Sequence, residues 1–312
     1  MRFTLLTLLT LCACAEATAA PKHLEAAGVA IRADVDDGTY RVGSGAITAW
    51  IIRSAEIVAQ YYDRFPTTSL HIRVVPEEGD GVRGGKTFGR EGGFIRVEVG
   101  RDVTADQLRN DWVLVHEMTH LALPDTGEEH AWLSEGLAVY VEGVARVQAG
   151  NRTQADVWAE EIRSMPRGLP QPGDAGLDHT HTWGRTYWGG AMFCLLADVE
   201  IHRRTANRYG LQDALRAIVR ESGGLVTDWP VERVFKTGDA AVGTPVLEDL
   251  YAKMKDTPIK PDLMSLWRQL GVEPDGSSVR LSDEAPLAAI RQSIMQPRGS
   301  LIPARKTPSS PR

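Results

Sequence analysis

Apolar side chains recur at helical spacing in one early segment and alternate with polar ones in two later segments. The helical spacing predicts a helix over about residues 45–64, carried by Ile47, Trp50, Ile51, Ile57, Val58, Tyr61 and Phe65. Residues 70–74 and 94–99 alternate apolar with polar positions, which predicts two half-buried strands. Glycines at seven positions from 79 to 93 indicate a loop-rich hairpin region between these strands.

The rest of the chain is mainly helical in pattern. Thr104 and Gln107 form a capping box, which predicts a helix that carries residues 112–121 and stops before Pro124. Further helices are expected over about 131–148, 153–164, 185–204, 211–221, 245–254 and 261–270, with a loop over 166–182 and a short strand and last helix within 280–295.

These elements predict an α+β fold without internal repeats. We expect a small mixed β-sheet lobe over about residues 22–123, in which the weakly patterned 22–44 form a strand and turns, and a mostly α-helical lobe over about 124–295. Together they make one domain, residues 20–295. Residues 296–312 contain four prolines and several basic residues, so we expect a disordered tail.

Composition narrows the classes of partner. The chain has 312 residues, of which 43% are hydrophobic, so it can bury a substantial core. The formal net charge of −6 and the pI near 5.8 provide no basic surface for nucleic acid, and we expect no nucleic-acid partner.

The first nineteen residues have the pattern of an export signal. Arg2 precedes a short apolar run from Leu5 to Cys14, and Ala17 and Ala19 satisfy the small-x-small rule for cleavage after residue 19. We therefore expect an exported protein, either periplasmic or secreted. The alternative is a lipoprotein whose lipidated Cys14 attaches it to a membrane.

One pentapeptide, His116-Glu117-Met118-Thr119-His120, carries the candidate chemistry. Histidines four apart on a helix are offset by only about 40° around its axis, so both imidazoles leave the same face and can bind one cation. Glu117 beside them can reach a water molecule on that cation. This is the HExxH signature of a zinc hydrolase; the alternative is two histidines packed on an amphipathic helix.

Glu135, in the next predicted helix, is the candidate third ligand. His116, His120 and Glu135 would hold Zn²⁺ and leave one coordination position open. Glu117 would then act as general base and acid, taking the proton of the activated water and passing it to the leaving amine.

With Glu135, the pentapeptide resembles the gluzincin metallopeptidases, which pair HExxH with a downstream glutamate. The resemblance covers His116–His120 and Trp132–Tyr140. It implies a thermolysin-like zinc site between the two lobes and hydrolysis of peptide or protein substrates. Fourteen residues separate His120 from Glu135, a shorter connection than in thermolysin and aminopeptidase N relatives, so the loop between them must be tight.

A second resemblance covers Thr186–Phe193, which is similar to the Tyr-x-x-Gly-Ala segment of glycyl aminopeptidases and aminopeptidase N relatives. It implies that the Tyr187 hydroxyl stabilises the oxyanion of the tetrahedral intermediate. His179 and His181 compete for this role, because thermolysin relatives use a histidine. Tyr187 would otherwise be a core aromatic residue.

Gluzincins bind extended peptides along an edge strand, and residues 94–99 are the candidate for it. The Gly-x-Met-Glu-Asn motif that anchors a free amino terminus in aminopeptidase N is absent. The sequence thus predicts an exported zinc metallopeptidase. The alternatives are a non-catalytic, zinc-containing binding protein and a zinc hydrolase of cell-wall amides or esters.

Overall fold

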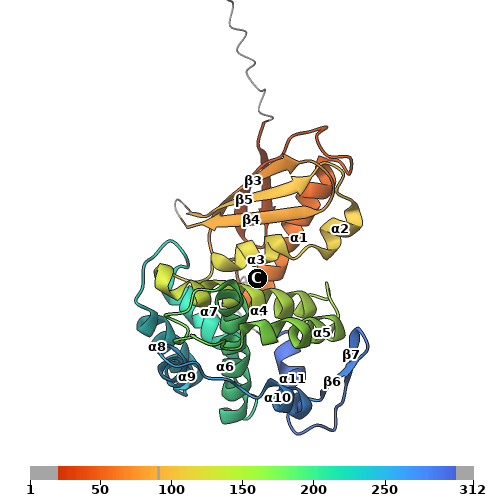
Figure 1. The fold of residues 1–312 in the computed structure, drawn as a ribbon. Coiled ribbons are helices and arrows are strands. Elements are labelled where there is room, and N and C mark those ends of the chain that lie inside the picture. The colour runs from red at the N-terminus through yellow and green to blue at the C-terminus, as the bar shows by residue number, and fades with distance from the viewer. Residues whose placement is uncertain (1–19, 90–91, 300–312) are drawn as a thin grey trace, which may run out of the picture.

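The computed structural model describes residues 20–89 and 92–299 (Figure 1). It has an N-terminal β-sheet lobe followed by a helical lobe, so the predicted α+β class is confirmed. Helices α3 (Val113–His120) and α4 (Ala131–Gln148) lie where the two lobes meet. The expected signal segment, residues 1–19 with Cys14, lies outside the described residues.

The sheet of the first lobe has five strands in the order β1-β2-β3-β5-β4. Strand β3 pairs in parallel with β2 and β5, while β1 and β4 close the two edges in antiparallel pairing. The strands are β1 (Lys22–Ala26), β2 (Val29–Asp34), β3 (Ser69–Glu77), β4 (Val82–Phe88) and β5 (Phe94–Gly100).

The glycine-rich region, expected as a loop-rich hairpin, forms the antiparallel pair of β4 with β5, in which β4 is a strand of seven residues. One expectation about this sheet is wrong. Strand β5, our candidate for the substrate-binding edge, lies between β3 and β4, so β4 is the edge strand on this side. Glycine weakens a strand on average. The two glycines within residues 82–88 are therefore the reason that the sequence did not predict a strand there.

The helix expected from Thr104 to Leu121 is in fact two helices. Thr104 and Gln107 form the capping box of α2 (Ala105–Asn110). The chain then leaves helical geometry at Asp111, and α3 begins at Val113. The Asp111 carboxylate caps the new helix by accepting hydrogen bonds from the backbone N–H groups of Val113 and Leu114, both at 3.1 Å.

The helical lobe follows the predicted order, with α8, β6 and the short 3-10 segments η2 and η3 as additions. Its elements after α4 are α5 (Gln154–Ser164), η3 (Met165–Gly168), η4 (Gly184–Gly189), α6 (Gly190–Arg204), α7 (Leu211–Ser222), α8 (Val231–Val242), α9 (Val246–Met254), α10 (Leu263–Leu270), β6 (Val272–Asp275), β7 (Ser278–Leu281) and α11 (Ala288–Met295). Before α4 lies the 3-10 turn η2 (Glu128–His130), and α1 (Ser44–Tyr62) packs against α3 and α4.

Helices α4 and α6 cross at a pair of glycines. A Cβ atom on Gly136 would overlap the backbone of Gly190, and one on Gly190 would overlap the carbonyl of Trp132. Only glycine permits this close approach. The crossing positions η4, a π-helical segment directly before α6, against the helix that carries Glu135.

The C-terminal part of the chain is ordered further than expected. Arg298, placed in the disordered tail from its sequence, forms an ion pair with Asp213 at 2.9 Å and donates to the Arg208 carbonyl. Residues 300–312 lie outside the described residues. Cys194 is buried, as expected for a structural thiol. Among the described residues, no helix is long and apolar enough to cross a bilayer.

Candidate metal centre and active site

Three donor atoms converge where α3 meets α4. The Nε2 atom of His116 lies 3.3 Å from Glu135 Oε2, and Nε2 of His120 lies 3.5 Å from the same oxygen. All three ligand atoms lie within 4.8 Å of one another. His116 and His120 share one face of α3, and α4 presents Glu135 to that face. The structure therefore brings together the three residues predicted as metal ligands.

A neighbouring hydroxyl orients one of the imidazoles. His120 Nδ1 lies 2.9 Å from Ser134 Oγ and, in the tautomer that carries its proton on Nδ1, donates a hydrogen bond to it. In that tautomer the Nε2 lone pair can bind a metal ion. A hydrogen bond to the ring nitrogen that does not bind the metal fixes the tautomer of metal-binding histidines. His116 Nδ1, by contrast, is buried without a hydrogen-bond partner among the described residues.

The electrostatics of the cluster favour a positive charge at its centre. Burial alone would raise the pKa of Glu135, but hydrogen bonds from His116 and His120 lower it to about 2. Burial alone would lower the pKa of His120, but the Glu135 carboxylate beside it raises this pKa. Two imidazoles with one carboxylate are also the donor set of catalytic zinc sites. These residues therefore fit a divalent ion such as Zn²⁺.

Glu117 is held by the edge strand of the sheet. Thr87 on β4 donates its hydroxyl to Glu117 Oε2 at 2.6 Å and lies 2.8 Å from the Glu117 carbonyl oxygen. Gly85, two residues earlier, leaves room for the same side chain, since a Cβ there would lie 2.5 Å from Glu117 Cγ. The β4–α3 contact thus fixes one carboxylate oxygen and leaves Oε1 available.

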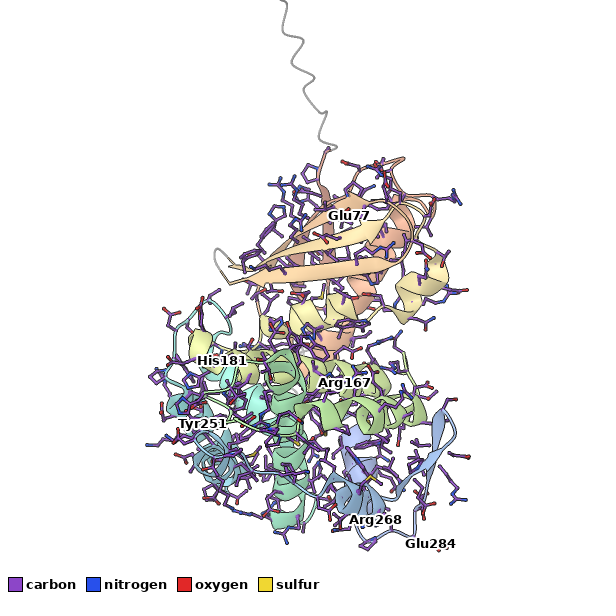
Figure 2. The ribbon with its side chains drawn as sticks, viewed as in Figure 1. Glu77, Arg167, His181, Tyr251, Arg268 and Glu284 are labelled. Atoms are coloured by element: carbon purple, nitrogen blue, oxygen red, sulfur yellow. The ribbon has the colours of Figure 1, made fainter. Side chains whose placement is uncertain are left out.

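Tyr187 reaches the site from η4. It lines the same cavity as the three candidate ligands. Burial, together with the nearby Glu135 and Glu117 charges, raises its pKa, so the hydroxyl keeps its proton as a hydrogen-bond donor. The two competing histidines lie elsewhere: His179 is exposed and pairs with Asp256 at 2.8 Å, and His181 is exposed on the helical lobe (Figure 2).

The cavity around the cluster has a volume of about 500 Å³. It is lined by residues 83–87 of β4 together with His120, Ser134, Glu135 and Tyr187. Within the described part of the chain, strand β4 pairs on one side only, with β5. An unpaired strand edge therefore runs along a cavity that also contains the candidate metal ligands.

Sequence reasoning missed the residues that support the ligands. Ser134 directly precedes Glu135, but its contact with His120 depends on how α3 and α4 pack. Thr87 and Gly85 lie about thirty residues before Glu117 in the sequence, and nothing in their local pattern indicates that β4 reaches it. No sequence signal could have identified these supporting residues, because their roles arise from contacts between elements far apart in the chain.

Comparison with solved structures identifies the fold. An aminopeptidase N family protein from Idiomarina loihiensis has a TM-score of 0.60 at 15% identity, over 85% of this chain and 53% of that chain. An M1 zinc metallopeptidase variant bound to L-arginine has a TM-score of 0.51 at 13% identity, over 78% and 53%. An M1 zinc metallopeptidase variant from Deinococcus radiodurans, bound to a Tyr-Ser-Ala substrate, has a TM-score of 0.51 at 12% identity, over 78% and 53%.

These similarities confirm a gluzincin peptidase fold, as the sequence motifs indicated. The chain spans about half the length of the structures that it matches. No family model and no curated protein matches the sequence. At these sequence identities the comparisons show the fold alone and not the activity.

Proposed function

We propose that this chain is a zinc-dependent metallopeptidase that hydrolyses peptide bonds with water. The observation that carries the proposal is the convergence of His116, His120 and Glu135, with their donor atoms within 4.8 Å of one another, beside Glu117. A structural zinc site does not need this second carboxylate, whereas hydrolysis needs a base next to the attacking water.

Each residue then has a definable task. Zn²⁺ supplies Lewis acidity, which lowers the pKa of water and polarises a carbonyl oxygen. Glu117, anchored through Oε2 by Thr87, accepts the water proton at Oε1 and delivers it to the departing amine nitrogen. The Tyr187 hydroxyl donates a hydrogen bond to the oxygen on which negative charge develops.

The edge strand supplies a binding surface for the substrate backbone. An extended peptide can add to the unpaired side of β4 (Val82–Phe88), which positions its backbone through main-chain hydrogen bonds. The same strand holds Glu117 through Thr87. One rigid element would thus align the peptide and the base, and this corrects our assignment of the edge to residues 94–99.

The test is peptide profiling with matched variants. Purified protein should contain about one zinc per chain and cleave a peptide mixture whose products are identified by mass spectrometry. E117Q should retain the metal and lose turnover, whereas H116A and H120A should lose both. Y187F should retain the metal and reduce kcat more than it raises KM, because the oxyanion forms only during the reaction.

Two results would contradict the proposal. Cleavage that survives both chelation and E117Q would exclude the mechanism. Bound zinc without hydrolysis of any peptide would favour the non-catalytic zinc protein, and cleavage restricted to peptidoglycan fragments or esters would favour the other hydrolase. For this reason the substrate panel should include these compounds beside the peptides.

We also propose that the chain is exported, on the pattern of residues 1–19 alone. Sequencing the amino terminus of the mature protein separates the two routes. A terminus at Ala20 supports a soluble product, and a blocked, lipid-modified Cys14 supports membrane attachment. An unprocessed terminus at Met1 would contradict both.

A further inference from the structure

A second cavity adjoins the central one. Its volume is about 380 Å³, and Trp112, His116 and Tyr187 line both cavities. We call it the side pocket and define it by residues of α4 and α5 and by the segment before α6, chiefly Val139, Gly143, Val157, Glu161, Trp183 and Trp188. A side chain of a peptide held at the metal centre would therefore have a space of its own to enter.

The walls of the side pocket are mainly apolar. Val139, Val157 and Trp188 contribute aliphatic and aromatic surface from three different elements. Gly143 lets α4 approach α5 closely, since a Cβ there would lie 3.1 Å from Val157 Cγ1. Trp183 is 57% exposed. Such walls suit a long hydrocarbon stem, and the rings add a surface that attracts cations.

One carboxyl group in the pocket has no partner. Glu161 is only 5% exposed, and its Oε2 atom has no hydrogen-bond partner among the described residues. Burial raises the pKa of this group to about 8, so it carries a proton near neutral pH. Leaving a buried polar group without a partner is unfavourable, so a ligand that supplies the partner binds more tightly.

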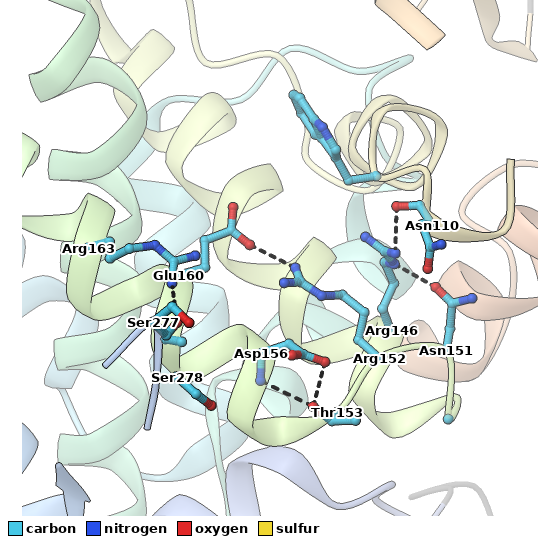
Figure 3. A pocket seen from close by; sticks show the side chains of 13 residues that line it. Asn110, Arg146, Asn151, Arg152, Thr153, Asp156, Glu160, Arg163, Ser277 and Ser278 are labelled. Atoms are coloured by element: carbon cyan, nitrogen blue, oxygen red, sulfur yellow. Dashed lines mark hydrogen bonds and ion pairs between the residues drawn. The ribbon is translucent and has the colours of Figure 1, made fainter. Parts of the chain in front are cut away.

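The other two glutamates of the pocket are paired with arginines. Glu142 pairs with Arg146 at 2.6 Å, and Glu160 pairs with Arg152 at 2.8 Å. Glu160 lines the side pocket and also a neighbouring cavity, in which it pairs with Arg152 (Figure 3).

Among the described residues that line the side pocket there is no lysine, and the only arginine is Arg167. It is exposed and lies over the Trp183 ring, 6.0 Å from the centroid, so solvent screens its charge. A cationic ligand would therefore interact most strongly with Glu161, the buried carboxyl group of the pocket that has no partner among the described residues.

We propose that the side pocket is a specificity pocket for a lysine or arginine side chain of the substrate, whose cationic head pairs with Glu161; the proposal rests on the proposed peptidase function. The hydrocarbon stem packs between Val139, Val157 and Trp188. On pairing, the Glu161 carboxyl releases its proton to solvent and accepts charged hydrogen bonds. Such bonds contribute about 1.5–3 kcal/mol, which corresponds to a preference of roughly 10- to 100-fold.

The test uses peptides that differ at one residue. Lysine, arginine, norleucine and methionine are placed in turn on each side of the cleaved bond; norleucine has an apolar stem like that of lysine but no charge. Wild-type protein should cleave the lysine and arginine peptides roughly 10- to 100-fold better than the norleucine peptide, measured as kcat/KM. E161Q should lose this preference, so that its kcat/KM for the lysine peptide falls to about that for the norleucine peptide.

Two further variants keep the test decisive. E161M fills the same space without a polar group, so it should fold even if E161Q does not, and it should favour norleucine. E160Q alters the adjacent residue, which lines the same pocket but is paired with Arg152, and it should retain the preference for lysine. Equal loss of the preference in E160Q and E161Q, or no preference in the wild type, would overturn the proposal.

A binding measurement separates the pocket from the peptidase function. Zinc-loaded wild-type protein is titrated with n-pentylammonium and with pentan-1-ol, and binding is followed by calorimetry. The ammonium ion should bind about tenfold or more tightly than the alcohol, and E161M should abolish the difference. Binding that depends on Glu161 without any peptide cleavage would support the pocket and refute the function. No selective binding of the ammonium ion would overturn the pocket, whatever the activity.

Discussion

Replacing Gly85 by alanine tests whether strand β4 sets the position of the base. The new Cβ would lie 2.5 Å from Cγ, 2.9 Å from Cδ and 3.0 Å from Oε1 of Glu117. Carbon atoms in contact are about 3.5–4.0 Å apart, so the Glu117 side chain or the strand must move by about 1 Å. Either movement disturbs the hydrogen bond from Thr87 that holds the carboxylate.

A displacement of this size has a large expected effect on rate. A 1 Å misplacement of a reacting group costs about 100-fold, so we expect G85A to reduce kcat/KM by about that factor. The three nearest atoms all belong to Glu117, so the ligands are untouched and the zinc content should stay near one per chain. The assay is steady-state hydrolysis of a peptide that the wild type cleaves, with metal measured in the same samples.

The neighbouring glycine provides the matched control. A Cβ on Gly84 would meet nothing within 4 Å, so G84A makes the same chemical change in the same strand and should leave kcat/KM within a few-fold of wild type. If G85A, with zinc bound, is as active as G84A, then contact with β4 does not position Glu117 and the reasoning is refuted.

Three other variants test separate parts of the structure. S134A removes the acceptor for His120 Nδ1, so we expect zinc affinity, measured by competition with a chelator, to fall by about 10- to 100-fold; unchanged affinity would contradict the role of Ser134. Burial raises the pKa of Glu161 to about 8; its protonation therefore stabilises the fold below the unfolded-state pKa, and this contribution is lost as pH rises through 8. Thermal melts of E161Q should accordingly lose stability less steeply than wild type between pH 5 and about 8. G136A places a methyl group into the Gly190 backbone, and its free energy of unfolding should fall by about 1–3 kcal/mol or more, measured in denaturant; a wild-type midpoint would disprove the close crossing.

The sequence predicted the elements whose signals are local. The helix over 45–64 is confirmed by α1 (Ser44–Tyr62), and the strand over 94–99 by β5 (Phe94–Gly100). In both, apolar residues recur at a regular interval, because one face of the helix or strand is buried. The predicted continuous helix from Thr104 was wrong, because Asp111 starts a new helix by capping Val113. Pattern alone does not distinguish one interrupted helix from two that follow each other closely.

For the site, the sequence by itself determined the chemistry of the candidate ligands. His116 and His120 share a helix face as a consequence of helical geometry, and Glu117 lies beside them for the same reason. Assigning Glu135 as the third ligand also required that α4 pack against α3. The position of Glu135 in a conspicuous helical motif suggested this packing. These residues are near one another in the chain, so local rules are sufficient to relate them.

Only the tertiary structure decided what surrounds that chemistry. Contacts between distant segments decide which strand forms the edge of the sheet and bring Thr87 and Gly85 to Glu117. They also place Glu161 in the side pocket, without a hydrogen-bond partner among the described residues. Such contacts are selected by the burial of whole faces, a non-directional force that is summed over many side chains. The sequence around one residue therefore does not show which distant residues will contact it. The sequence therefore specified the reacting groups, whereas the fold specified their support and the shape of the space that a substrate would enter.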